Sequence, residues 1–249
     1  MKCFIVLPCY NEEQNIDLLI PHIDKTLRDY IPYQIIAIND GSDDDTGQLL
    51  KHLSKQHPIE VLEHPKNKGL AATLQTGISA AVQRSSDGDL IVTMDSDNTH
   101  DPAYILDMMK VATEADVVVG SRYMRNGRQM NVPPHRMILS RTINFLIRKI
   151  ANLSVMDATS GYRCFKASAL KKLKKNMGQR FMESKGFEAS LEILLKMFWC
   201  NSTIKEVPIT LDYGKKEGWS KMKLLPTIKR YVILLTKIKA WRNELEANS

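Results

Sequence analysis

Two carboxylates, Asp95 and Asp97, follow the apolar residues 90–94, a run that predicts a buried strand. Ser96 and Asn98 beside them are turn formers, so we expect the strand to stop here and the chain to turn. Open α/β sheets bind ligands at the carboxyl ends of their strands. Two carboxylates there suit Mg²⁺ or Mn²⁺, with water and a substrate diphosphate completing the coordination. The alternative is a solvated acidic turn that caps the next helix.

Polar side chains follow three other predicted strands as well. They are Tyr10 and Glu12 after residues 3–7, Asp40 after 34–38, and Ser121 and Arg122 after 117–120. Because the carboxyl ends of parallel strands share one edge of a sheet, we expect these groups to line one crevice together with Asp95 and Asp97. Four such groups in register favour a binding site over chance.

The elements that must position these side chains alternate along the first half of the chain. Apolar runs predict strands at residues 3–7, 34–38, 59–62, 90–94 and 117–120, with helical patterns between them. This order predicts an α/β fold with a doubly wound, mostly parallel sheet flanked by helices. The second half predicts helices at 135–153 and 187–198, a short strand at 164–165 and an edge strand at 203–211.

Charge is distributed unevenly along the 249 residues. Residues 1–100 carry 8 Lys and Arg against 15 Asp and Glu, whereas residues 101–249 carry 27 against 13. This asymmetry favours a metal-binding part joined to a part that handles anions or an anionic surface. With 7% aromatic residues and no recognisable nucleic-acid module, we expect no nucleic-acid partner.

The four cysteines show no CxxC spacing, and we expect buried free thiols in a reducing compartment. The apolar run that follows Met1 and Lys2 breaks at Pro8, so we expect no signal peptide. Apolar runs are also shorter than the ~20 residues that span a bilayer. We therefore expect a cytoplasmic protein, either free or peripheral on the cytoplasmic face of a membrane.

The tail is predicted to be an amphipathic helix over residues 224–245. Nine Lys and Arg and one acid lie between Gly214 and Arg242. One interpretation is a helix docked on its own domain or on a dimer partner, and the other is a helix on an anionic membrane surface. We place a domain boundary between residues 1–223 and 224–249. The expected apolar stripe consists of Leu224, Ile228, Tyr231, Leu235, Ile238 and Leu245.

A set of motifs in a fixed order supports a resemblance that covers residues 3–225. The motifs are LPCYNE at 7–12, NDGS at 39–42, NKGL at 67–70, MDSD at 94–97, GSRY at 120–123, SGYR at 160–163 and GWSK at 218–221. The chain resembles the family 2 inverting glycosyltransferases of the GT-A fold. Within that family it is most similar to the dolichyl- or polyprenyl-phosphate mannosyltransferases, and the last two motifs point to that branch.

The resemblance implies roles for individual residues. It would place Pro8, Tyr10, Glu12 and Asp40 around the nucleoside of a nucleotide-sugar donor such as GDP-mannose or UDP-glucose. It would place the metal, Mg²⁺ or Mn²⁺, on Asp95 and Asp97. It would direct Arg122 and Arg163 to the acceptor phosphate or sugar, and Lys221 to the diphosphate or acceptor phosphate.

The chain departs from this branch in two places. Thr99 stands where the branch usually carries Gln as a further metal ligand, so fewer protein atoms would hold the metal. Many relatives also carry transmembrane helices at the carboxyl end, where this chain has a basic amphipathic tail.

The implied reaction displaces a nucleoside diphosphate from the anomeric carbon of the sugar. A polyprenyl phosphate acceptor is already ionised and needs cations rather than a base. A sugar or protein hydroxyl needs a general base, for which Asp157 and Glu188 are the candidates. Two other hypotheses are less favoured. A nucleotidyltransferase would need a glycine-rich opening loop, but residues 7–13 contain no glycine. A non-enzymatic nucleotide-binding module would not need the carboxylate pair.

Overall fold

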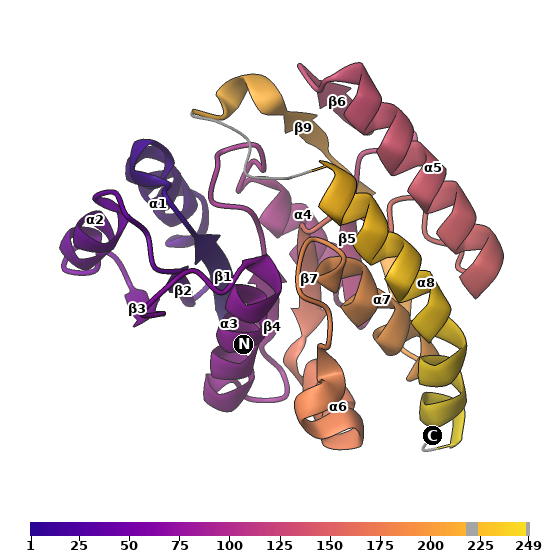
Figure 1. The fold of residues 1–249 in the computed structure, drawn as a ribbon. Helices are drawn as coiled ribbons and strands as arrows, with labels where there is room; N and C mark the ends of the chain where they lie inside the picture. Colours follow the sequence, from indigo (N-terminus) through magenta and orange to yellow (C-terminus); the bar gives the residue numbers. More distant parts are fainter. Residues whose placement is uncertain (218–223, 248–249) are drawn as a thin grey trace.

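The computed structural model describes residues 1–217 and 224–247 and is built on one seven-stranded sheet (Figure 1). The spatial order of its strands is β3-β2-β1-β4-β7-β5-β8. All neighbouring pairs are parallel except those made by β7, which runs antiparallel to both β4 and β5. The strands are β1 (Cys3–Cys9), β2 (Tyr33–Asn39), β3 (Ile59–Glu63), β4 (Leu90–Thr93), β5 (Val117–Ser121), β7 (Arg163–Lys166) and β8 (Ile204–Pro208).

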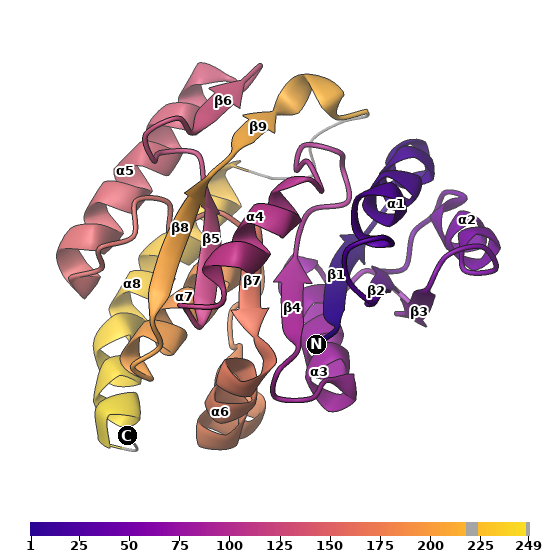
Figure 2. The same cartoon turned by 180° about the vertical axis from the view of Figure 1, so that it is seen from behind.

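Helices cover both faces of the sheet, which confirms the predicted α/β class. Strand β1 shows why its sequence reads as one apolar run: Phe4 and Val6 enter one core, while Ile5 and Leu7 enter the other. One face, seen in Figure 2, is covered by α1 (Glu13–Leu27), α2 (Thr46–Leu53) and α4 (Tyr104–Val111). The other face carries α3 (Leu70–Arg84), α5 (Pro134–Ala151), α6 (Ala167–Met177), α7 (Ala189–Trp199) and α8 (Leu224–Ala247).

The antiparallel strand β7 is the main feature of the sheet that the alternation of elements does not predict. Residues 163–166 insert between β4 and β5, with Thr93 opposite Arg163 in the register. Because β7 runs in the opposite direction, its first residues lie beside the last residues of β4. A Cβ on Gly161 would accordingly lie 3.8 Å from Asp95 Oδ1. The loop before β7 therefore lies against the carboxylate turn at this edge of the sheet.

The single edge strand expected at 203–211 is wrong in one respect, because the structure divides it into two strands. Residues 204–208 form β8 at the edge of the main sheet, and β9 (Thr210–Asp212) pairs instead with β6 (Arg128–Met130). Residues 209–217 thereby leave the main sheet, and a short 3₁₀ helix, Tyr213–Lys215, follows β9. The backbone N–H of Thr210 donates to the hydroxyl of Tyr104 at 3.0 Å, which holds this segment near the turn after β4.

Helix α8 docks on the protein's own core through one face. Leu234, Ile238, Trp241 and Leu245 are buried in the same cluster as residues of α3, α6 and α7. Four members of the predicted stripe, Tyr231, Leu235, Ile238 and Leu245, pack on this core, and the stripe omitted Leu234 and Trp241, which are buried beside them. The boundary predicted at residue 223 lies outside the described residues. No helix of the described chain has the length and apolarity needed to cross a bilayer.

Candidate active site

The turn after β4 is held together by short-range hydrogen bonds. The hydroxyl of Thr99 donates to Asp97 Oδ1 at 2.6 Å, and the Thr99 backbone N–H donates to the same oxygen at 3.2 Å. Asn98 takes a left-handed φ of +62°, a conformation that Asn adopts more readily than most residues. The backbone N–H of Asp95 donates to His100 Nδ1 at 3.1 Å. The strand therefore stops where the sequence predicts, and both carboxylates lie in one turn.

The two carboxylates differ in their electrostatic environment. Lys216 Nζ donates to Asp97 Oδ2 at 2.5 Å, and both side chains are 13% exposed. Burial by itself would raise the pKa of Asp97, but Lys216 and Thr99 hold that pKa below its usual value. Among residues 1–217 and 224–247, no cationic group lies within hydrogen-bond distance of the Asp95 carboxylate, and desolvation, with the neighbouring charge of Asp97, raises its pKa. Asp95 therefore binds a proton more readily than Asp97, although both lie at the same strand end.

The chemistry of this donor set fits a divalent cation that receives its remaining ligands from a substrate. Among residues 1–217 and 224–247, no group of three or more His, Cys, Asp or Glu side chains is arranged to hold a metal. The hydroxyl of Thr99 is engaged with Asp97. The ammonium of Lys216 already occupies a cation position at Asp97 Oδ2. Two carboxylates at a strand end suit Mg²⁺ or Mn²⁺ with added phosphate oxygens.

Residues after β1 lie at the same edge of the sheet as the carboxylate turn. Glu12 is buried, and its Oε2 accepts a hydrogen bond from Asn15 Nδ2 at 2.7 Å. Pro8 contributes its carbonyl oxygen, which accepts from the hydroxyl of Ser96 at 2.6 Å and so joins β1 to the carboxylate turn. The hydroxyl of Tyr10 lies 3.5 Å from Asp43 Oδ2 in the turn after β2. The structure brings these residues together as predicted, and their contacts with a nucleoside stay a prediction.

Asp40, at the end of β2, holds the loop that leads to α3. Its Oδ1 contacts His64 Nδ1 at 2.6 Å and accepts from the backbone N–H of Lys68 at 3.0 Å, and its Oδ2 accepts from Gly69 at 2.8 Å. A Cβ on Gly41 would lie 2.5 Å from the Lys66 backbone, so only glycine permits this close packing. Asp40 thus fixes the loop between β3 and α3, and His64 is a partner that the sequence analysis missed.

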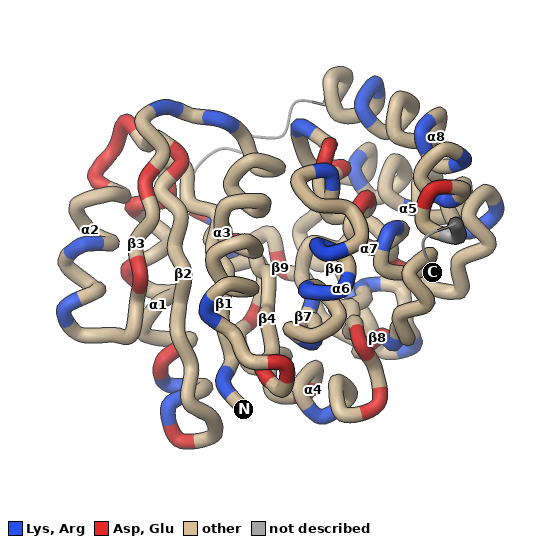
Figure 3. Tube along the Cα trace, turned by 90° about the horizontal axis from the view of Figure 1, so that it is seen from below, with Lys and Arg blue, Asp and Glu red and all other residues tan. Residues whose placement is uncertain are grey.

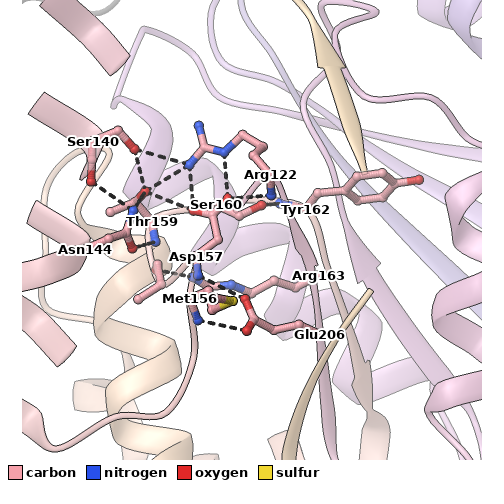
Figure 4. Close-up of polar contacts among 11 residues, drawn as sticks. Arg122, Ser140, Asn144, Met156, Asp157, Thr159, Ser160, Tyr162, Arg163 and Glu206 are labelled. Carbon is pink, nitrogen blue, oxygen red and sulfur yellow. Dashed lines mark hydrogen bonds and ion pairs between the residues drawn. The ribbon is translucent and has the colours of Figure 1, made fainter. Parts of the chain in front are cut away.

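Arg122, whose side chain is 14% exposed, and the buried Asp157 form a bidentate ion pair (Figure 4). Arg122 Nε donates to Asp157 Oδ2 at 2.7 Å, and Nη2 donates to Oδ1 at 2.7 Å. Nη2 also donates to the hydroxyl of Thr159 at 3.0 Å, while Ser140 and Asn144 of α5 join the same network. Arg122 holds the pKa of Asp157 below its usual value against the opposing effect of burial. Arg122 is therefore fixed in one orientation at the end of β5.

Arg163, at the start of β7, is almost completely buried. Its Nη2 donates to the carbonyl oxygen of Ala158 at 2.7 Å, and its Nη1 donates to that of Ser190. Burial lowers the pKa of Arg163 to about 10, with the charge of Asp157 acting in the opposite direction. The side chain thus stays cationic near neutral pH and joins the loop before β7 to α7. Its predicted contact with an acceptor stays a prediction.

The two candidate bases occupy different states. Asp157 is fully buried and is committed to Arg122. Glu188 is buried too; its Oε1 accepts from the backbone N–H groups of Lys185 and Gly186 at 3.1 Å. Its Oε2 has no hydrogen-bond partner among the described residues. Lys221 lies outside the described residues, so its predicted role is neither supported nor opposed.

Sequence reasoning missed two residues that the structure brings to the carboxylate turn, Lys216 and Asn15. The lysine-rich stretch that begins at Gly214 indicates a cationic segment, but the sequence does not indicate which of its lysines contacts Asp97. Asn15 Oδ1 accepts from the backbone N–H of Glu217 at 3.1 Å, and Asn15 Nδ2 donates to the Glu217 carbonyl oxygen at 3.2 Å. This pair of bonds fastens the segment that carries Lys216 to the start of α1.

Comparison with known proteins identifies a family and several relatives. Residues 4–174 match the model of glycosyl transferase family 2. The chain is 29% identical over 250 residues to a dolichol-phosphate mannosyltransferase of Pyrococcus furiosus, a match that covers 99% of this chain and 66% of that protein. It is 28% identical over 224 residues to a polyprenol monophosphomannose synthase of Mycolicibacterium smegmatis, covering 89% and 81% of the two chains.

Solved structures support the fold. Glucosyl-3-phosphoglycerate synthase from Mycobacterium tuberculosis in complex with phosphoglyceric acid superposes with a TM-score of 0.66 at 16% identity, covering 97% of this chain and 80% of that one. The same enzyme in complex with Mn²⁺, uridine diphosphate and glucosyl-3-phosphoglycerate gives a TM-score of 0.65 at 16% identity, covering 97% and 79%. These likenesses confirm the expected α/β architecture with its mostly parallel sheet.

Proposed function

This chain belongs to glycosyl transferase family 2, and from that premise we propose that it transfers mannose from a nucleoside-diphosphate sugar to a polyprenyl phosphate. Membership of this family makes the chain a nucleotide-sugar glycosyltransferase. The sugar and the acceptor class follow the names of the relatives, which include an undecaprenyl-phosphate mannosyltransferase of Micrococcus luteus that is 28% identical over 224 residues. The donor is GDP-mannose in this proposal, with UDP-glucose as the other candidate.

The carboxylate turn is the proposed site for the donor diphosphate. Asp95 and Asp97 would hold Mg²⁺ or Mn²⁺, which when bound supplies charge neutralisation for the leaving diphosphate. The solved neighbour that binds Mn²⁺ with uridine diphosphate is in keeping with this assignment. Glu12 and Asp40 stand on the neighbouring strand ends, where a nucleoside attached to that diphosphate would extend.

The state of Asp157 is the observation that carries the acceptor class. A hydroxyl acceptor needs a free base, and Asp157 is held by Arg122 in a buried bidentate pair with a lowered pKa. A phosphate monoester acceptor is ionised near neutral pH and attacks the anomeric carbon without losing a proton to the protein. Among the described residues, no hydrogen bond reaches Arg122 Nη1, so this nitrogen can donate to a phosphate oxygen.

An exposed apolar surface on α5 and α8 supports a lipid partner. The two helices lie side by side in Figure 1, and α5 contains no acidic residue. Lys and Arg run along α6 and α8, whereas Asp and Glu gather in the turns beside α2 (Figure 3). We propose that this surface binds an anionic membrane peripherally, on the cytoplasmic side. Its exposed apolar side chains are Ile138, Phe145, Leu146, Ile150, Leu225, Val232 and Ile233.

One observation favours the alternative acceptor, a sugar or other hydroxyl in cell-surface glycan assembly. Glu188 Oε2 is buried without a hydrogen-bond partner among the described residues, which is the state of a carboxylate that could accept a proton. The variant Glu188→Gln separates the two acceptors. It should abolish transfer to a hydroxyl and leave transfer to a polyprenyl phosphate within a few-fold of wild type.

Transfer from labelled GDP-mannose and UDP-glucose tests the proposal directly. Each donor is incubated with and without a polyprenyl phosphate, and with Mg²⁺ or a chelator. A solvent-extractable labelled lipid that forms only with metal and with one donor is the expected result. Metal-dependent donor turnover without a labelled lipid would reject the lipid acceptor and favour a hydroxyl acceptor, with Glu188 as the candidate base.

A further inference from the structure

The ammonium of Lys216 contacts Asp97 at the place where the proposed divalent metal would bind. It contacts the oxygen of Asp97 that faces away from Thr99, since Oδ1 accepts from Thr99 and Oδ2 from Lys216. Because Oδ1 already accepts two hydrogen bonds from Thr99, a divalent cation on this carboxylate would bind Oδ2, the oxygen that Lys216 contacts. An ammonium and a divalent cation on one oxygen repel each other, so both cannot stay there.

We propose that Lys216 and the divalent metal exchange on Asp97, and that the displaced ammonium then contacts the diphosphate that the metal binds. This inference rests on the metal site of the proposed function and adds a residue that acts on the donor. In the protein without metal, Lys216 neutralises Asp97. In the loaded protein, its charge is available to oxygens of the leaving group.

The surroundings of Lys216 keep the released ammonium in the donor site. The charges of Asp97, Glu12 and Asp95 raise the pKa of Lys216, although burial alone would lower it, so the side chain lies among three carboxylates. The next residue, Glu217, is fastened through its backbone to Asn15 by two hydrogen bonds. The lysine stem is flexible while its backbone is held, which allows the ammonium to move a short distance without moving the segment.

Manganese binding without nucleotide tests the exchange, because it needs neither donor nor acceptor. Free Mn²⁺ is measured by electron paramagnetic resonance during titration of wild type, Lys216→Met and Lys216→Arg. Methionine keeps much of the stem and removes the charge. We expect Lys216→Met to bind Mn²⁺ about tenfold more tightly, since no ammonium competes for Asp97, and Lys216→Arg to stay near wild type. Equal or weaker binding by Lys216→Met would overturn the exchange.

Lys215→Met is the matched control. Lys215 carries the same charge one residue away, but it is half exposed and pairs with Asp101 at 3.6 Å. Its removal should change Mn²⁺ affinity less than twofold. A tenfold effect in this variant would show a general charge effect and reject a specific exchange. If Lys216→Met is unstable, Lys216→Gln, which removes the same charge, replaces it in the titration.

A second titration tests the destination of the ammonium. With saturating Mn²⁺, Lys216→Met should bind the nucleoside diphosphates GDP or UDP about tenfold more weakly than wild type, measured by calorimetry. Unchanged nucleotide affinity would reject the contact with the diphosphate while leaving the exchange intact. The proposed function fails separately, in the transfer assay, if no labelled lipid forms although Mn²⁺ binding behaves as expected here.

Discussion

The carboxylates Asp95 and Asp97 and the ion pair Arg122–Asp157 lie at the same edge of the sheet, yet contacts of different range hold them in place. Asp97 takes its turn geometry from Thr99, two residues away. Arg122 takes its orientation from Asp157, thirty-five residues away, and from Ser140 on α5. The turn that carries Asp97 is thus formed by local sequence, whereas the orientation of Arg122 depends on the packing of the second half of the chain.

The difference has a consequence for mutation. A residue placed by a local turn can be changed with little effect on the core, so function and stability separate. A buried charge that orients another buried charge cannot be removed without leaving its partner unpaired, so function and stability fall together. The following variants test this difference between the two sites.

Asp97→Asn should have the largest effect on activity. Asparagine keeps the shape of the turn and can still accept from Thr99, but it removes the negative charge that would hold the metal. We expect transfer to fall by about 10³-fold or more, while the free energy of unfolding falls less than in Asp157→Ala, because the flexible stem of Lys216 can carry its unpaired ammonium to solvent. Steady-state kinetics and urea unfolding measure the two quantities. Near-normal turnover would disprove the metal site, and Asp101→Asn, outside the pair, is the control.

Asp157→Ala should affect stability most. It leaves the guanidinium of Arg122 buried without its counter-ion, and we expect a loss of about 3–5 kcal/mol in the free energy of unfolding. Asp87→Ala is the matched control, because Asp87 pairs with Lys171 at 2.8 Å with its side chain 78% exposed. The control should cost about 1 kcal/mol or less. Similar losses in both variants would show that the Arg122–Asp157 pair contributes no more to stability than an exposed ion pair.

The apolar surface on α5 and α8 gives a smaller, separable effect. Phe145→Ser combined with Val232→Ser removes two exposed apolar side chains without touching the core. We expect binding to anionic phospholipid vesicles to fall about tenfold in sedimentation, since each buried apolar side chain contributes to partitioning. Leu18→Ser with Tyr30→Ser, exposed on the opposite half, should bind like wild type. Equal loss in both double variants would refute a specific lipid surface.

The contributions of Asp157 and Asp95 to the pH dependence of stability should have opposite signs. The folded pKa of Asp157 is lowered, so its stabilisation is present above the unfolded pKa of about 3.9 and is lost as pH falls through the folded pKa. The folded pKa of Asp95 is raised, so its charge costs stability at neutral pH, and the cost disappears as pH falls below about 3.9.

Thermal unfolding between pH 3 and 8 checks these signs. Asp95→Asn should melt slightly above wild type at pH 7 and at the same temperature near pH 3, a small effect because Asp95 is half exposed. Asp157→Asn should melt below wild type at pH 7, with the gap narrowing on acidification. A stabilised Asp157→Asn would reverse the assignment of the two carboxylates.

Local patterns explain why the donor side was predictable. The buried strands read as apolar runs because both faces of the sheet are covered, and the turn formers after residue 94 end β4 where expected. The carboxylates Asp95 and Asp97 follow from those two facts. Predicting that Glu12 and Asp40 stand on adjacent strand ends needed only the rule for parallel sheets.

Long-range contacts explain what the sequence did not reveal. Lys216 reaches Asp97 across 119 residues, and Glu217 reaches Asn15 across 202, distances in sequence over which no periodicity operates. Helix α8 shows the limit of periodicity itself. Apolar residues occur around much of its circumference, with Leu225 and Val232 exposed and Leu234 and Trp241 buried. A helix of this kind does not reveal from its spacing which face meets the core.

The insertion of β7 between β4 and β5 also sets an order of events during synthesis on the ribosome. Strand β5 is complete at Ser121, but its neighbour in the sheet begins only at Arg163. At translation rates of about 5–20 residues per second, the intervening residues, roughly 40 in number, take about 2–8 seconds to be made. During that interval one edge of β4 and both edges of β5 lack their partners, since β8 begins only at Ile204, and unpaired strand edges are prone to pair with other chains. Slowed translation within residues 122–162 would lengthen that exposure.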